Sequence, residues 1–177
     1  MKVFIAGPRS VTKLNPIVMK KLDNIMMKKY KILVGDANGA DKAVQKYCSE
    51  QGYNNVVVYS TGERTRNNIG NWEKINVSAP KGLKGFDFYA VKDKQMAKDA
   101  DYGFMIWNGR SKGTFNNLIN LVKFNKTALL FLTTNNKYYK IKDMDDINKL
   151  TKLVNNYEID QFLINRINSD EQLILEL

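Results

Sequence analysis

Short apolar runs alternate with helical stripes along most of the sequence, and this alternation constrains the fold more than any other feature. Five runs have the length and composition of buried strands: 2–6, 31–34, 55–59, 102–107 and 127–132. Between most of them, apolar residues recur every three or four positions, as in amphipathic helices. Because each crossover must return across a face of the sheet, such strands lie parallel. The sequence therefore predicts an α/β fold, a Rossmann-like doubly wound parallel sheet of about five strands flanked by helices.

Composition excludes several classes of function. At 177 residues the chain has the size of one domain. With no histidine and only Cys48, it cannot build a usual zinc site or a histidine-based triad, so we expect no metal and no cofactor. The charge of +10 favours polyanions, yet the basic residues are scattered, so nucleic acid is a possible partner but not the favoured one. No apolar run approaches the roughly 20 residues of a membrane span, so we expect a cytoplasmic protein without membrane contacts.

Residues 60–88 show no period and mix glycine and proline with basic side chains. A loop this long inside a compact domain is usually functional or disordered. Arg64 and Arg66 are candidates for a lid over an anionic ligand. Trp72 either stacks on a base or anchors the loop, whereas Trp107 ends a buried strand and is predicted to be core or pocket wall.

Loops that follow the strands meet at one edge of a parallel sheet, where ligands bind in doubly wound folds. After the strand 31–34, glycines permit positive φ and close approach to the backbone, and the following helix N-terminus favours a phosphate. The candidate ligand-binding residues of this first glycine loop are Gly35, Asp36, Asn38, Gly39 and Asp41. Asp41 either caps the helix or reaches a ribose hydroxyl.

A second glycine loop has the same strand-to-helix context and adds hydroxyl groups and two cations. Its candidate ligand-binding residues are Asn108, Gly109, Arg110, Ser111, Lys112, Gly113 and Thr114. The turn after the strand 2–6 contributes Gly7, Pro8, Arg9 and Ser10, where a guanidinium can bind a phosphate bidentately. The sequence therefore predicts a phosphate-binding edge.

Three of these segments resemble motifs of the SLOG superfamily. Gly35–Asp41 resembles its GGARGAD-type loop, Lys92–Ala97 with Ala100–Asp101 resembles its RDxxMA…AD stretch, and Ile106–Thr114 resembles its IWDGKSKGT motif. The motifs occur in the right order. The resemblance implies a nucleotide or ADP-ribose-type ligand, a SLOG-like nucleotide-binding domain over residues 1–134 and a homo-oligomer.

The superfamily includes Lonely-guy phosphoribohydrolases, DNA-processing protein A and sensors of nucleotide-derived signals. In Lonely-guy enzymes a PGGxGTxxE motif carries a glutamate that takes part in N-glycosidic cleavage, but Asn117 stands at that position here. An amide cannot act as a carboxylate base. The start Met1–Pro8 is also similar to nucleoside 2-deoxyribosyltransferases, which cleave the same type of bond with carboxylates.

These observations leave the function open between three classes. In the first, the protein binds a nucleotide-type ligand and cleaves or transfers at its N-glycosidic bond, with Asp93 or Glu73 as the catalytic carboxylate and Lys94 as a ligand contact. Tyr89 faces this ligand or packs in the core. In the second, it is a non-catalytic sensor or sequestering protein for a signal such as a cyclic ADP-ribose derivative. Single-stranded DNA binding is the third.

Residues 135–177 differ from the rest of the chain. They contain a possible edge strand, 137–142, and apolar residues that predict two or three short helices, the last reaching 173–177. We expect a small helical extension packed on the same domain, and either a structural appendage or a partner-binding surface.

Overall fold

The computed structural model describes the backbone of residues 1–175 and the side chains of residues 1–169, so the predicted helical residues 176 and 177 lie outside the described part. Within it, one sheet contains seven strands in the order β4-β3-β2-β1-β5-β6-β7. The strands are β1 Lys2–Ala6, β2 Lys31–Gly35, β3 Val56–Thr61, β4 Glu73–Val77, β5 Tyr102–Trp107, β6 Ala128–Leu132 and β7 Lys137–Ile141. The helices are α1 Pro16–Met27, α2 Ala40–Glu50, α3 Gly85–Asp99, α4 Lys112–Lys123, α5 Met144–Val154 and α6 Tyr157–Leu175.

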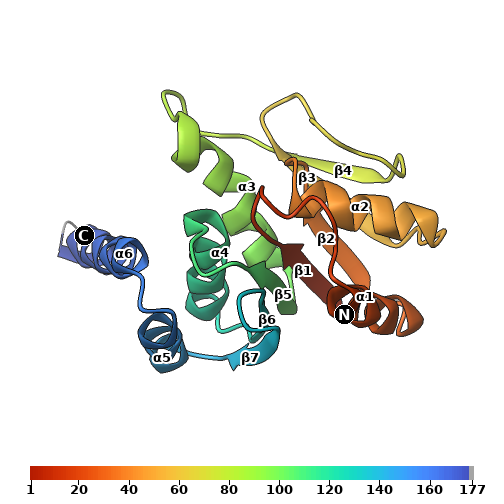
Figure 1. Cartoon of the computed structure of the whole chain (residues 1–177). Helices are drawn as coiled ribbons and strands as arrows, with labels where there is room; N and C mark the ends of the chain where they lie inside the picture. The colour runs from red at the N-terminus through yellow and green to blue at the C-terminus, as the bar shows by residue number, and fades with distance from the viewer. Residues whose placement is uncertain (176–177) are drawn as a thin grey trace.

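The central strands are apolar throughout because helices cover both faces of the sheet. Phe4 and Leu33 pack toward α3 and α4, whereas Ile5 and Val34 pack toward α1 and α2. Figure 1 shows these two pairs of helices on opposite sides of the sheet. A strand buried on both faces loses the polar alternation of a half-exposed strand, which explains the continuous apolar runs in the sequence.

The chain order reverses between β1 and β5. Strand β1 pairs in parallel with β2 on one side and with β5 on the other. The connections from β1 therefore lead toward one edge of the sheet and those from β5 toward the other, which opens a crevice beyond the carboxyl ends of these two strands. The predicted doubly wound parallel sheet is confirmed, and it has seven strands where about five were expected.

One additional strand lies in the segment 60–88, so the interpretation of that whole segment as a loop was wrong. Strand β4 pairs in parallel with β3, with Val57 opposite Glu73. As an edge strand it buries only part of one face through Ile75 and Val77, so its polar residues hide the pattern. Helix α3 also begins within this segment, at Gly85.

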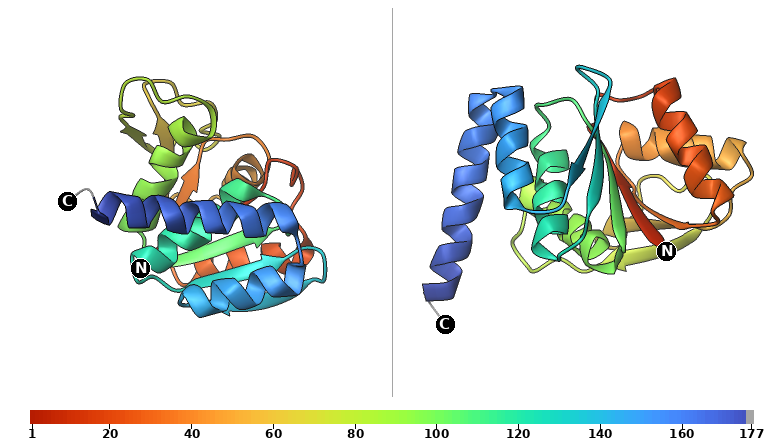
Figure 2. Two further views of the ribbon diagram at one scale, coloured as in Figure 1. Left: turned by 90° about the vertical axis from the view of Figure 1, so that its left-hand side faces the viewer. Right: turned by 90° about the horizontal axis from the view of Figure 1, so that it is seen from below.

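The C-terminal segment extends the sheet and adds an outer helical layer. The predicted edge strand is confirmed as β7, which pairs antiparallel with β6. Helices α5 and α6 pack against the α4 side of the core through Ile147, Leu150, Ile159 and Leu163 (Figure 2). Helix α6 has 19 residues, so the expectation of only short helices was wrong. Among the described helices, none combines the length and apolar character that a membrane crossing requires.

Candidate functional site

A cavity of about 600 Å3 lies at the switch point, between the loop that follows β1 and the loop that follows β5. Helix α3 forms its opposite wall, and the first turns of α4 close one end. The residues of the β1 loop that were predicted to bind a ligand all line it: Gly7, Pro8, Arg9 and Ser10. From the second glycine loop, the lining residues are Asn108, Arg110, Ser111, Gly113 and Thr114.

The β1 loop reaches this position because two glycines let it pass close to α2. A Cβ atom on Gly7 would lie 2.7 Å from the Cβ of Ala40. Gly39 has φ +87°, and a Cβ there would overlap the backbone of Arg9. The Pro8 carbonyl then accepts a hydrogen bond from the Ala40 amide at 3.2 Å. The β1 loop therefore packs against the N-terminus of α2 and separates most of it from the cavity.

The first glycine loop consequently supports the site from behind. Of its predicted ligand-binding residues only Asp41 lines the cavity, and Gly35, Asp36, Asn38 and Gly39 do not. A Cβ on Gly35 would lie 2.9 Å from Lys92 Nζ, so this glycine makes room for a buried charge. Strand β2 is one position away from the switch point, which explains why its loop lies behind that of β1.

Asp36 holds the segment before β4 in place. Its buried carboxylate accepts hydrogen bonds from the Arg66 amide and Nε, both at 3.0 Å, and from Arg66 Nη2 at 2.6 Å. Burial raises the pKa of Asp36, but the hydrogen bonds from Arg66 outweigh burial and hold that pKa below its ordinary value. Arg66 also lies over the ring of Tyr89 at 4.4 Å and lines the cavity, whereas Arg64 does not.

A buried group of charges forms the floor of the cavity. Lys92, with 3% of its surface exposed, donates a hydrogen bond to Asp93 Oδ1 at 2.5 Å, and Asp41 lies close to the same ammonium. Burial lowers the pKa of Lys92, but the charges of Asp93 and Asp41 outweigh this effect and keep the lysine protonated. Burial raises the pKa of Asp41 to about 6, opposed by Lys92. Asp93 and Asp41, both predicted from the sequence as site residues, therefore lie together on the floor of the cavity.

The N-terminus of α4 forms the cationic end of the cavity. Asn108 Oδ1 accepts hydrogen bonds from the amides of Arg110 at 3.1 Å and Ser111 at 2.9 Å, which fixes the loop. Ser111 caps the helix by accepting from the Thr114 amide at 3.3 Å. Within the described part of the chain, the guanidinium groups of Arg9 and Arg110 form no hydrogen bond or ion pair. They remain available to an anion.

Asn117 presents an unusual feature to the same cavity. The residue lines the cavity with 3% of its surface exposed, and its Oδ1 atom has no hydrogen-bond partner among the described residues. A buried polar atom without a partner costs about 1–3 kcal/mol. The side-chain amide of Asn117, which stands where the Lonely-guy motif has its glutamate, therefore offers a hydrogen-bond acceptor that is still without a donor among the described residues.

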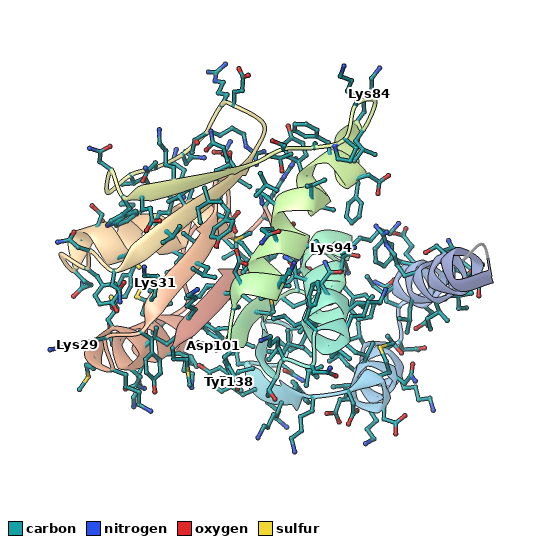
Figure 3. All side chains as sticks on the ribbon, turned by 180° about the vertical axis from the view of Figure 1, so that it is seen from behind. Lys29, Lys31, Lys84, Lys94, Asp101 and Tyr138 are labelled. Atoms are coloured by element: carbon teal, nitrogen blue, oxygen red, sulfur yellow. The ribbon has the colours of Figure 1, made fainter. Side chains whose placement is uncertain are left out.

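Two predicted site residues lie elsewhere. Glu73 stands at the start of β4 opposite Val57, and its carboxylate lies 3.9 Å from the ammonium of Lys31. It is therefore near the amino ends of the strands, away from the cavity. Lys94 lies on the side of α3 toward α4 and α6, as Figure 3 shows. The buried lysine of this motif is Lys92, two residues earlier.

The remaining residues of the second glycine loop have structural contacts. A Cβ on Gly109 would approach Val154 to 3.0 Å, and its φ of +74° favours glycine. Lys112 points outward and lies 3.5 Å from a carboxylate oxygen of Glu158. Trp107 stacks on Phe115 at 5.3 Å between ring centres and belongs to the core.

Sequence reasoning missed Lys92 and Phe86 as parts of the site. Helical spacing offers a signal for Lys92, because Lys92 and Met96 share a face of α3 that also carries Tyr89. No sequence signal pointed to Phe86, because it lies in the segment 60–88, which shows no helical period. Trp72 is buried against the α1–α2 side of the core, so it anchors its loop and does not reach the cavity.

Comparison of the sequence with models of protein families and with curated proteins found no match. In the described residues, no group of three or more histidine, cysteine or acidic side chains is arranged to hold a metal ion. The site is therefore described by its own groups: a cationic end at α4, an aromatic wall on α3 and a carboxylate pair on the floor.

Proposed function

We propose that the protein binds a nucleotide or an ADP-ribose-type ligand in the cavity between the carboxyl ends of β1 and β5. The observation that carries this proposal is the position of a helix N-terminus and of two guanidinium groups at the topological switch point of the sheet. Among the described residues, these two groups, of Arg9 and Arg110, have no hydrogen bond or ion pair. Doubly wound folds bind nucleotides at this point. Membership of the SLOG superfamily is part of the same proposal and is supported by the three sequence motifs.

The α4 end of the cavity suits the phosphate of such a ligand. Amides of the first helical turn have no carbonyl partner within the helix, and the helix dipole favours an anion there. Gly113 lines the cavity in this turn, beside Ser111 and Arg110. A guanidinium can add two parallel hydrogen bonds to a phosphate. Arg9, on the facing loop, completes a cationic clamp.

The middle of the cavity suits a nucleoside. Tyr89 and Phe86 supply ring surfaces on α3 on which a base can stack. Asn117 Oδ1 lacks a donor, and a ribose hydroxyl or a base amino group would supply one. Asp93 lies nearby as a hydrogen-bond acceptor for hydroxyl groups.

Cleavage or transfer at the N-glycosidic bond is a second candidate function, favoured by Asp93. Its carboxylate is only 19% exposed, lines the cavity and is held by Lys92, so it can face a positive charge that develops on a ribose. Asn117 favours the alternative of a non-catalytic sensor or sequestering protein, because its amide provides binding without a charge or a base.

Thermal unfolding with a panel of nucleotides, followed by mass analysis of the ligands, tests the proposal. A ligand at 100 times its Kd should stabilise the protein by about 2.7 kcal/mol. Arg110→Ala should remove this shift, whereas Arg64→Ala, which removes an exposed arginine outside the cavity, should keep it. If the wild-type protein releases a free base and Asp93→Asn does not, the protein is an enzyme that cleaves the N-glycosidic bond. If the ligand is recovered intact, the protein is a binder. No shift with any nucleotide would refute the proposal.

A further inference from the structure

A second cavity of about 590 Å3 adjoins the first, and the two share Asn108 and Arg110 as lining residues. Its other walls come from the end of β6 with the turn that follows, and from the junction between α5 and α6. Figure 2 shows this junction and the β6–β7 turn at the same end of the molecule. The second cavity therefore continues the first along the carboxyl edge of the sheet.

The chain fixes both sides of the second cavity. Asn155 ends α5 in the left-handed region, with φ 49°, and turns the chain sharply into α6. Asn156 then donates a hydrogen bond from Nδ2 to the carbonyl of Gly109 at 3.2 Å, and Val154 packs where a Cβ of Gly109 would be. The C-terminal segment is thus tied to the loop that carries Arg110.

The chemistry of this second cavity differs from that of the first. Amide side chains dominate its polar lining: Asn108, Asn135, Asn155 and Asn156. Arg110 is its one charged lining group among the described residues. Apolar surface comes from Leu132, Leu153 and Val154, and the ring of Tyr157 stands at the rim with 76% of its surface exposed. Such a lining suits a neutral group with a ring face and several hydrogen-bonding edges, such as a nucleoside.

Arg110 stands between the two cavities, and its guanidinium forms no hydrogen bond or ion pair with the described residues. A bridging phosphate is the group that such a cation binds best. Each cavity falls within the 300–1,000 Å3 of ordinary ligand sites, so a mononucleotide would leave the second one unfilled. We propose that the ligand is a two-part nucleotide, with two nucleoside-like halves joined by a pyrophosphate that crosses Arg110. This inference rests on the proposed function and narrows its ligand class.

Titration calorimetry with adenosine monophosphate and with diadenosine pyrophosphate, which carries a base on each half, tests the inference. Because occupation of the second cavity becomes intramolecular once the first is filled, diadenosine pyrophosphate should bind at least about 10-fold more tightly. Tyr157→Ala should weaken the binding of diadenosine pyrophosphate by about 10-fold through lost base stacking and leave that of adenosine monophosphate within about twofold of wild type. Tyr157→Phe keeps the ring and should keep the affinity for diadenosine pyrophosphate.

The possible failures are distinguishable. Equal affinities for the two ligands, together with no effect of Tyr157→Ala, would overturn the inference that the ligand extends into the second cavity. The proposed function would still stand. Absence of binding by both ligands would overturn the proposed function and the inference with it. A lower molecular mass of ligand-free Tyr157→Ala in sedimentation would assign this rim to an interface between copies and would overturn the inference.

Discussion

Asp41→Asn should change the pH dependence of stability in a defined direction. Burial of Asp41 raises the pKa of its carboxyl from an ordinary 3.8 to about 6. Between these two pH values the folded protein holds a proton that the unfolded chain has released. The stability that this proton provides is fully present below pH 3.8 and is lost as the pH rises through 6.

The size of the effect follows from the same two values. One pKa unit corresponds to about 1.36 kcal/mol, so the free energy of unfolding should fall by about 3 kcal/mol across this interval. Asparagine cannot ionise, and the variant lacks this component. The difference in unfolding free energy, Asp41→Asn minus wild type, should therefore rise by about 2 kcal/mol between pH 4 and pH 6.5, because the first part of the change falls below pH 4.

Urea unfolding monitored by circular dichroism at several pH values measures this difference. Asp145→Asn makes the same chemical change at an exposed position in the first turn of α5 and serves as the matched control. A difference between Asp41→Asn and wild type that stays flat with pH, or that falls as the pH rises, would refute the account of a buried carboxyl balanced against Lys92.

Further substitutions test the groups behind the cavity, each by urea unfolding. Lys92→Met should destabilise the protein by about 3–5 kcal/mol at pH 7, because it leaves buried carboxylates without their cation; an effect under 1 kcal/mol would contradict the buried cluster. Arg66→Ala should lower the free energy of unfolding by about 2 kcal/mol at neutral pH. Because the pKa of Asp36 is lowered in the folded protein, this loss should become smaller as the pH falls below the usual pKa of an aspartate. A loss that stays the same in acid would contradict the pairing of Asp36 with Arg66. Gly39→Ala should lower the free energy of unfolding by about 3 kcal/mol, because the residue has positive φ and a Cβ would overlap the β1 loop. Gly52→Ala should cost clearly less, because Gly52 also has positive φ but has open space around it. Equal losses would contradict the close approach of the β1 loop to Gly39.

The fold was predictable where burial is complete. Strands such as β1 and β3 are covered on both faces, so their apolar runs stand out from the helical stripes around them. Strand β4 lacked this signal because it lies at an edge and exposes Glu73 and Lys74. Its pairing with β3 depends on residues distant in the sequence, which no local pattern contains.

The candidate site was predictable in its location and less so in its members. The rule for parallel sheets placed all strand-following loops at one edge, but the strand order decides which of them meet. Because β1 and β5 are the neighbours at the reversal, Arg9 and Arg110 line the cavity and Asn38 does not. The sequence also could not show that Lys92 lines this cavity and Lys94 does not, because packing sets the rotation of α3 about its axis.

A crystal structure of the protein with bound ADP-ribose tests the central claim most directly. The account predicts density in the cavity between the β1 and β5 loops, with a phosphate oxygen within hydrogen-bond distance of Arg110 and of the first-turn amides of α4, and with a donor atom facing Asn117 Oδ1. Density confined to another surface, such as the groove around Lys94, would contradict it.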